Sequence, residues 1–317
     1  MLALITGLVA LLAFGVVGVR PAFADTSSYV QSAEALQLPA NQYQDDYADA
    51  AWAVYGTACA SAGSCVAVGY YAVGSSLFTR PVVFPVTDGV PGTALEVQQP
   101  TGAIAGDGSL TGISCSSATS CVAVGSYKNA GTSLPLLVPI VGGVPQAAQT
   151  PSLPSGATSP PSNGTQHASL DWATCPATGA CEAVGAYYNS SALEQTDVVS
   201  ISGGVPGFAV AVTPPAGYAS GDPYVGVAGL SCSSASLCVA PGYYYGSGVD
   251  YAAVTIVIGP TGPSVQETAL PSGAAQTDSE FDAGYTSAAV CVPSAPCLST
   301  GWYYTANGPV GPTSILQ

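Results

Sequence analysis

Basic residues are almost absent from this 317-residue chain, which has 3 Lys and Arg against 18 Asp and Glu and a formal net charge of −15. Arg20 lies in an apolar N-terminal stretch, so only Arg80 and Lys128 carry positive charge beyond it. Such a surface repels phosphate backbones and anionic lipid headgroups. We therefore expect neither nucleic-acid binding nor direct membrane binding.

Histidine is equally scarce, because His167 is the single one in the sequence. A Ser-His-Asp triad would depend on that residue, which lies in a long Pro- and Ser-rich segment, and no G-x-S-x-G sequence occurs. Zinc would need four convergent N, S or O ligands, and the cysteines come only in twos. The question of an enzyme stays open, and the composition weighs against one.

Long apolar runs are missing beyond the N-terminus, which excludes further membrane-spanning helices. Leu2 to Val19 are nearly all apolar, and Ala22-Phe23-Ala24 fits the small-x-small pattern of a secretory cleavage site. We predict that residues 1–24 are a cleaved signal peptide, with a retained membrane anchor as the alternative. Residues 25–317 are then extracellular or in the cell envelope, where disulfides persist.

The ten cysteines form five pairs with the same C-x5-C spacing, and the pairs recur every 56 to 60 residues. A period of this length is typical of repeat architectures. A disulfide across a short hairpin is the expected state of each pair, and each would stabilise the fold by about 2 kcal/mol in the chain-entropy estimate. The pairs are Cys59 with Cys65, Cys115 with Cys121, Cys175 with Cys181, Cys232 with Cys238 and Cys291 with Cys297.

Aligning the repeats predicts four short β-strands in each. Strand A leads into the first cysteine and strand B starts at the second, with sequences such as CVAVG. Strand C is the next apolar stretch and ends in a hairpin turn such as Asp88-Gly89 or Gly142-Gly143. Strand D follows and ends at a proline, which cannot continue a ladder.

The two ends of the chain complement each other. Repeat 5 has strands A and B and a possible strand C in TSILQ, but no strand D. Residues 33–40 read as the missing strand D. The sequence thus predicts an all-β fold, a five-bladed β-propeller with four antiparallel strands per blade over residues 25–317. Its N-terminal strand would close the last blade and leave no open sheet edge.

The phrase SC-x5-CVAVG-x-Y and the turn xGGVPG resemble repeats of secreted actinobacterial proteins of unknown function. The resemblance is carried by Ser114-Cys115 with Cys121 to Tyr127, and by Ser231-Cys232 with Cys238 to Tyr244. Repeat 5 departs from it, with Leu298-Ser299-Thr300 in place of Val-Ala-Val. The resemblance implies a β-propeller and export, and it brings no catalytic residues.

Acidic residues gather at one face of the predicted propeller. The D–A loops deliver carboxylates just ahead of strand A, and the B–C loops add more to the same face. A negative rim there would favour a cation or a positively charged partner, whereas the plain alternative is charge needed for solubility. The rim residues are Asp45, Asp46, Asp49, Asp107, Asp171, Asp222, Asp278, Glu280, Asp282, Glu194, Asp197 and Asp250.

One part of the acidic rim predicts a more specific ligand, a calcium ion. Asp278, Glu280 and Asp282 alternate, so an extended segment would place all three carboxylates on one side. An EF-hand loop is excluded because Ala283 and Ala289 stand at its glycine and glutamate positions. No cofactor is required by any pattern in the sequence, and calcium is the one that this cluster would take.

Tyrosines form the second pattern. One stands six residues past the second cysteine of every repeat, and this recurrence is typical of packing between blades. The additional tyrosines Tyr70, Tyr188, Tyr245 and Tyr304 are better candidates for binding, because tyrosine offers a flat apolar face with a polar tip. With Asp49, Asp107, Asp171, Asp222 and Asp282 they make up the predicted ligand-binding site.

Three classes of function remain open from the sequence. The first is a non-catalytic recognition module that binds carbohydrate or a surface protein at the acidic, Tyr-rich loop face. The second is a glycoside hydrolase, which needs two carboxylates about 5 to 10 Å apart, such as Asp107 with Asp171 or Asp222. The third is a structural or adhesive component of the cell envelope.

Overall fold

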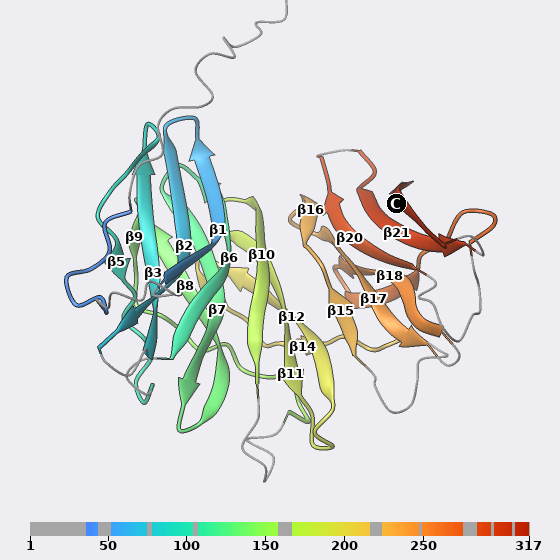
Figure 1. Ribbon diagram of the computed structural model, residues 1–317, viewed down its shortest axis with the longest axis horizontal. Helices are drawn as coiled ribbons and strands as arrows, with labels where there is room; N and C mark the ends of the chain where they lie inside the picture. Colours follow the sequence, from blue (N-terminus) through green and yellow to red (C-terminus); the bar gives the residue numbers. More distant parts are fainter. Residues whose placement is uncertain are drawn as a thin grey trace, which may run out of the picture. The chain divides into compact units, whose positions relative to one another are not determined.

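The computed structural model describes residues 36–43, 52–74, 78–103, 107–157, 167–215, 224–246, 249–274, 284–292, 295–305 and 308–316. These residues contain strands and turns but no helix, and the strands form five antiparallel sheets, one for each cysteine repeat (Figure 1). The predicted all-β class is therefore confirmed. No helix of the described residues has the length and hydrophobicity of a membrane span.

The sheets follow one another along the chain, and we number the repeats 1 to 5 accordingly. Repeat 1 contains β1 (Trp52–Ser61), β2 (Ser64–Val73), β3 (Phe78–Thr87), β4 (Val90–Pro91) and β5 (Leu95–Glu96). Repeat 2 contains β6 (Gly108–Ser117), β7 (Ser120–Asn129), β8 (Thr132–Val141) and β9 (Val144–Pro145). Repeat 3 contains β10 (Ser169–Ala177), β11 (Ala180–Tyr188), β12 (Glu194–Ser202), β13 (Val205–Pro206) and β14 (Val210–Ala211).

Repeat 4 contains β15 (Val225–Val227), β16 (Ser231–Ser234), β17 (Leu237–Gly246), β18 (Val249–Gly259) and β19 (Gly262–Glu267). Repeat 5 contains β20 (Gly284–Val290), β21 (Leu298–Thr305) and β22 (Gly308–Leu316). Each sheet runs in the order of strands A, B and C, as predicted. Strand D is shorter than predicted, because prolines near its end leave only a few residues able to continue the ladder.

Each cysteine pair joins the two strands of one A–B hairpin. In repeats 1, 2 and 4 the two half-cystines face each other directly in the ladder, as Cys115 does Cys121. All ten cysteines are paired as predicted, so no free cysteine remains, and five disulfides suit an oxidising compartment. The confirmed disulfides join Cys59 with Cys65, Cys115 with Cys121, Cys175 with Cys181, Cys232 with Cys238, and Cys291 with Cys297.

The glycine of CVAVG is required by a bulge in the neighbouring strand A. In repeat 2 the register of β6 and β7 shifts between Leu110 and Gly112, which leaves Thr111 as the extra residue. A Cβ on Gly125 would overlap the carbonyl oxygen of Ser109. The same overlap would arise in three other repeats, at Gly69, Gly185 and Gly242.

The C–D turns use the conformations that tight hairpins need. Gly142 and Gly143 have φ values of +58° and +81°, and Asp88 and Gly89 have +51° and +81°. Two consecutive residues with positive φ are typical of the type I′ turn, whose twist matches that of the strands it joins. The hairpins predicted from Asp-Gly and Gly-Gly are thus confirmed.

The tyrosine that recurs six residues past the second cysteine is a packing residue in repeats 1 to 4. Tyr71, Tyr127, Tyr187 and Tyr244 are all buried. In three repeats its hydroxyl bonds a polar side chain of the strand D segment: Tyr71 to Glu96 at 2.6 Å, Tyr127 to Thr150 at 2.7 Å and Tyr244 to Glu267 at 2.8 Å. Repeat 3 has Ala211 at that position, so Tyr187 lacks the tie.

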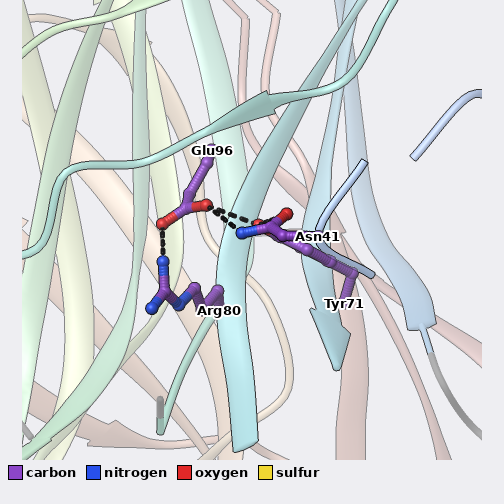
Figure 2. Close-up of polar contacts among 4 residues, drawn as sticks. All are labelled: Asn41, Tyr71, Arg80 and Glu96. Carbon is purple, nitrogen blue, oxygen red and sulfur yellow. Dashed lines mark hydrogen bonds and ion pairs between the residues drawn. The ribbon is translucent and has the colours of Figure 1, made fainter. Parts of the chain in front are cut away.

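Repeat 1 builds this tie into a larger network, which Figure 2 shows. Glu96 accepts hydrogen bonds from Tyr71, from Asn41 at 3.2 Å and from Arg80, with which it also forms an ion pair. Burial raises the pKa of Glu96, but these donors and the Arg80 charge lower it more, so the net shift is downward. The network fixes the segment containing Asn41 against repeat 1.

Residues 36–42 bind repeat 1 as a strand D segment binds the repeat that follows it. Ala94 N donates to Gln37 O at 3.0 Å, just as Ala148 N of repeat 2 donates to Gln98 O of repeat 1 at 3.4 Å. The turn bond from Gln42 N to Pro39 O, 3.0 Å, repeats after Pro100, Pro154 and Pro271. Among the described residues β22 pairs with β21, and no bridge joins it to residues 36–42.

Candidate functional site

The structure accounts for both basic side chains beyond Arg20. Arg80 pairs with Glu96, and Lys128 Nζ lies 2.7 Å from Asp107 Oδ2. Asp107, a predicted ligand-binding residue, therefore has a partner within repeat 2, at a hollow of about 210 Å³ that His167 also lines. The Lys and Arg side chains of the described residues are thus engaged in repeats 1 and 2.

Several predicted site residues lie outside the described residues. They include the whole predicted calcium cluster, so that site stays a prediction. The described residues contain no other group of three or more metal-ligating side chains. The predicted residues outside are Asp49, Asp222, Asp278, Glu280 and Asp282.

Asp171 lies inside strand β10 rather than in the loop ahead of it, so its predicted loop position was wrong. The register of β10 and β11 shifts between Leu170 and Trp172, which makes Asp171 the extra residue of the bulge. The corresponding residues elsewhere are uncharged: Tyr55, Thr111 and Ser287. Burial raises the pKa of Asp171, and a hydrogen bond with Ser169 lowers it by less.

Trp172 is a large residue at a position where the other repeats have a small one. The residue after the bulge is Gly56, Gly112, Gly229 or Ala288 elsewhere. The reason is close approach: a Cβ on Gly112 would lie 2.7 Å from the carbonyl oxygen of Asp171 in the next repeat, and one on Gly56 3.3 Å from that of Thr111. Trp172 instead has 42% of its surface exposed, so the inner strand of repeat 3 carries a bulky group where it turns toward repeat 4.

One face of the repeat 3 sheet meets repeat 4. Its middle is packed, because Val184 and Val198 share a core cluster with Val225 and other residues of repeat 4. Thr196 donates its hydroxyl to Val225 O and joins the two repeats directly. Since every second residue of a strand points to the same side, Glu182 and Tyr188 on β11 and Glu194 on β12 belong to this face.

Carboxylates and tyrosines converge at one end of this junction. Tyr188 is paired with Glu194 across β11 and β12, and Tyr224 precedes Val225, the residue that Thr196 binds. The ring of Tyr243 covers the Cα of Gly226, and its centroid lies 6.4 Å from that of Tyr245 in an edge-to-face arrangement. Tyr244 between them packs in the core cluster shared with repeat 3, so alternation places Tyr243 and Tyr245 on the other face of the repeat 4 sheet. We call the set on the repeat 3 side the 3–4 corner: Asp171, Tyr188, Glu194 and Tyr224.

The electrostatics of Tyr224 connect these groups. Burial raises the pKa of its hydroxyl, and the nearby charges and hydroxyls of Glu194, Tyr243, Asp171 and Tyr188 raise it further. Groups from both repeats therefore lie within electrostatic reach of one tyrosine. The 3–4 corner therefore combines the negative charges of Asp171 and Glu194 with the rings of Tyr188 and Tyr224.

The opposite end of the same junction is also open. A hollow of about 310 Å³ lies between repeats 3 and 4, with Glu182 and Ser200 on one side and Ser236 and Pro260 on the other. Burial raises the pKa of Glu182, and the hydrogen bond from Ser200, 2.9 Å, lowers it by less. The corresponding residues of the first two repeats are Val66 and Val122, so this carboxylate too is specific to repeat 3.

Asp197 is not a rim residue, contrary to the sequence-based expectation. It lies within β12, is 2% exposed, and stands where Val82, Leu136 and Val254 stand in repeats 1, 2 and 4. Burial, and then the charge of Asp171, raise its pKa to about 7. Its Oδ1 atom has no hydrogen-bond partner in the part of the chain that the structure describes. Alternation places it on the face away from the 3–4 corner.

Two of the other predicted tyrosines lie away from this corner. Tyr70 packs against Tyr55 in repeat 1, with ring centroids 5.7 Å apart. Tyr304 lies on β21 in repeat 5, is partly exposed, and is paired with Pro309. Of the predicted set, Asp171 and Tyr188 lie in repeat 3 and act electrostatically on Tyr224, whereas Tyr245 lies on the far face of the repeat 4 sheet. Glu194 is the cross-strand partner of Tyr188, and Trp172 and Tyr224 were not among the predicted binding residues.

No family model and no curated sequence matches the chain. Among solved structures, the chain is similar to Hadza microbial sialidase Hz136, with a TM-score of 0.48 and 8% identity over 84% of this chain and 58% of that one. It is also similar to the GH93 α-L-arabinofuranosidase of Fusarium graminearum in complex with arabinobiose, with a TM-score of 0.47 and 12% identity over 86% and 81% of the two chains.

A third similar structure is YCF48 bound to D1 peptide, with a TM-score of 0.38 and 10% identity over 83% of this chain and 69% of that one. All three TM-scores lie below 0.5, and the identities are far below 25%. Our proposals therefore rest on the residues described above and not on these likenesses.

Proposed function

We propose that the protein is an exported five-bladed β-propeller of the SC-x5-CVAVG type that recognises carbohydrate without chemically changing it. Five disulfide-pinned sheets in chain order support the blade count. The way in which residues 36–42 bind repeat 1 supports ring closure, with this segment as the outer strand of the last blade. A closed ring leaves no open sheet edge, which suits a secreted scaffold.

The observation that carries the proposal is the exposure of aromatic side chains. All three tryptophans of the chain are well exposed: Trp52 at 48%, Trp172 at 42% and Trp302 at 43%. Tryptophan is highly buried on average in folded proteins, so three exposed ones in a single chain call for a partner. Flat aromatic rings with a polar edge suit the apolar faces of sugar rings.

The described carboxylates give less support to a glycoside hydrolase. Asp107, one member of the predicted acid pair, forms an ion pair with Lys128. Asp197, whose pKa of about 7 would suit a general acid, is 2% exposed and lies too deep to touch a polysaccharide. Asp171 and Glu194 are partly buried, and burial raises the pKa of Asp171.

The test is binding of residues 25–317 to a panel of soluble polysaccharides, measured by affinity electrophoresis and calorimetry. We expect saturable binding, weakened about tenfold in Trp172→Ala, which removes an aromatic contact next to the 3–4 corner. Val90→Ala, at an exposed non-aromatic residue of the hairpin turn of repeat 1, is the control and should leave this binding unchanged.

Release of reducing ends in the same mixtures would instead establish a hydrolase. Absence of both binding and turnover across the panel would favour a structural or adhesive role in the cell envelope. A run with a calcium chelator tests whether the predicted calcium site contributes.

A further inference from the structure

The hollow of about 310 Å³ between repeats 3 and 4 has a polar pair of residues where the earlier junctions have an apolar pair. Glu182 of β11 pairs with Ser200 of β12, and both residues line the hollow. In repeats 1 and 2 the same positions face the next repeat, and the valine of each pair belongs to the core shared with that repeat. These pairs are Val66 with Pro85 and Val122 with Pro139.

The proline of each apolar pair fills the space beside the C–D turn of the next repeat. A Cβ on Gly143, in the turn of repeat 2, would lie 3.1 Å from the Cβ of Pro85. One on Gly204, in the turn of repeat 3, would lie 3.2 Å from the Cβ of Pro139. Ser200 has no ring to fill the corresponding space, so the hollow stays open beside the turn of repeat 4, and residues of that turn line it.

Trp172 belongs to the same face of the repeat 3 sheet as the hollow. It pairs with Val184, a residue of the core shared with repeat 4, and Thr174, two residues further on, pairs with Glu182. Diagonal neighbours such as Trp172 and Glu182 lie about 7 to 8 Å apart, which is within reach of an aromatic side chain. A ligand that fills the hollow and extends toward the inner strand therefore meets the exposed ring of Trp172.

The neighbouring inner strand of repeat 4 leaves room for this ring. Strand A is continuous in repeats 1 to 3, as β1, β6 and β10, whereas in repeat 4 it is interrupted between β15 and β16. Gly112 lies against the bulge residue of the next repeat, Asp171, and the equivalent neighbour of Trp172 is Ala228, in the interruption. The junction of repeats 3 and 4 thus departs from the others at its inner strands as well as at its C–D turn.

The chemistry of the lining indicates the ligand. An ionised carboxylate only accepts hydrogen bonds, and Glu182 accepts one from Ser200 at 2.9 Å, so a ligand must supply further donors. Arg80 and Lys128 are engaged in repeats 1 and 2, so neither serves Glu182. Sugar hydroxyls are such donors, and the apolar faces of sugar rings suit the aliphatic walls and the ring of Trp172. The aliphatic walls are Val198, Ile258, Pro260 and Pro263.

We propose that the hollow between repeats 3 and 4 holds one residue of a neutral sugar chain, with Glu182 accepting hydrogen bonds from its hydroxyls and Trp172 stacking on the neighbouring residue. This inference rests on the proposed function and names the class of carbohydrate. The negative charge of Glu182 repels carboxylate and sulfate groups, so the hollow discriminates against acidic sugars.

The experiment compares one polymer in two charge states. The neutral polysaccharide that binds most tightly in the panel is made into two derivatives of equal substitution, one carboxymethylated and one hydroxyethylated. Their binding to residues 25–317 is measured by calorimetry at about pH 8, well above the ordinary pKa of a glutamate. We expect the carboxymethylated derivative to bind at least about tenfold more weakly, because it brings negative charge to Glu182.

Three variants locate the effect. Glu182→Gln keeps the shape of the side chain without its charge, and it should bring the affinities of the two derivatives within about twofold of each other. The double variant Glu182→Val, Ser200→Pro installs the residues of repeats 1 and 2, fills the hollow, and should weaken binding of the unmodified polysaccharide about tenfold. Asp88→Asn, which removes a charge at the C–D turn of repeat 1, should change no affinity.

Thermal unfolding provides a readout that does not depend on binding. The double variant restores the packing of the other junctions, so its unfolding temperature should equal or exceed that of the unmodified protein. A loss of binding in a variant of this stability is then due to the filled hollow and not to misfolding.

Each remaining outcome overturns a different part of the account. Equal affinity for both derivatives overturns the discrimination against acidic sugars. Unchanged binding in the double variant, with binding still weakened in Trp172→Ala, overturns the location and leaves the proposed function standing. Binding of trilysine that is lost in Glu182→Gln assigns the hollow to a cation instead of a sugar. Failure of every polysaccharide in the panel sinks the proposed function itself.

Discussion

Repeats 1 and 2 each pair a carboxylate with a basic side chain, whereas repeat 3 is built differently. In the first two, Glu96 and Asp107 each have a basic partner, and the inner strands pack closely through Gly56 and Gly112. Repeat 3 contains four carboxylates and no Lys or Arg, and it has Trp172 at the glycine position. The repeats thus share one scaffold but differ in their inner strands. Repeats 1 and 2 have a glycine that lets the strands pack closely, whereas repeat 3 has an exposed tryptophan at that position and additional carboxylates. The four carboxylates are Asp171, Glu182, Glu194 and Asp197.

The largest expected effect comes from the buried carboxylate of repeat 3. The pKa of Asp197 rises from 3.8 in the unfolded chain to about 7 in the fold, so the folded state holds its proton more tightly. Its contribution to stability is full below about pH 4 and is lost as the pH rises toward 7. At about 1.36 kcal/mol per pKa unit the loss by pH 7.5 is about 4 kcal/mol.

Asp197→Val, which installs the residue of repeats 1 and 4, should therefore raise the free energy of unfolding at pH 7.5 by about that amount. Denaturant melts at pH 4 and pH 7.5 measure it. The variant should gain little at pH 4. An equal gain at both pH values would show that the pKa of Asp197 is not raised.

A second comparison places alanine at the position after the bulge in repeat 2 and in repeat 3. Gly112→Ala places a methyl group 2.7 Å from a backbone oxygen of repeat 3 and should destabilise the fold by about 1 to 3 kcal/mol. Trp172→Ala removes a partly exposed ring and should cost less than about 1 kcal/mol, because that ring is not buried in a core cluster. Chemical denaturation of both variants at one pH checks the difference. A larger cost for Trp172→Ala would mean that this tryptophan is a packing residue.

The recurring tyrosines offer a third comparison, with matched substitutions. Tyr71→Phe leaves a partly buried Glu96 without one donor and should cost about 1 to 2 kcal/mol. Tyr187→Phe removes a hydroxyl from a repeat whose strand D has Ala211 in place of Glu96, and it should cost less than about 0.5 kcal/mol. Thermal or denaturant unfolding measures both costs, and equal values would contradict the role given to Glu96.

The smallest effect is a proton taken up on binding. Burial already raises the pKa of Asp171, and a sugar that covers this carboxylate would raise that pKa further. Binding near that pKa should therefore take up a fraction of a proton, which appears as a dependence of the calorimetric enthalpy on the ionisation enthalpy of the buffer. Asp171→Asn should abolish this dependence. Persistence in the variant would assign the proton to another group.

Much of the fold was predictable because five copies of one pattern constrain it. The C-x5-C spacing and the turn after strand C, Asp-Gly or Gly-Gly, each recur, and they form the disulfides and the tight hairpins. The glycine of the CVAVG phrase lies opposite the strand A bulge. The bulges themselves were not predictable. The bulge position has no recognisable sequence signal, because it holds Tyr, Thr, Asp or Ser in different repeats.

The residues of the site could be read from the sequence only in part. Asp171 was selected as one of the carboxylates ahead of strand A, and Tyr188, Tyr245 and Tyr304 as tyrosines seven residues past the second cysteine of repeats 3, 4 and 5. Trp172 was missed, although an alignment of the repeats places it in a column of Gly and Ala. The ion pair of Asp107 with Lys128 could not be predicted, because the two residues lie 21 positions apart and the strand register brings them together. Asp197 looked like a loop residue because nothing local marks the start of β12.

The most direct test of the account is an NMR titration of the ¹³C-tyrosine-labelled protein, residues 25–317, with a polysaccharide that binds in the panel. We predict that ring signals of Tyr188 and Tyr224 shift together along one binding curve, while those of Tyr55 and Tyr70 in repeat 1 stay in place. Shifts centred on repeat 1, or spread evenly over all repeats, would contradict the claim that repeat 3 has diverged to bind a ligand at its junction with repeat 4.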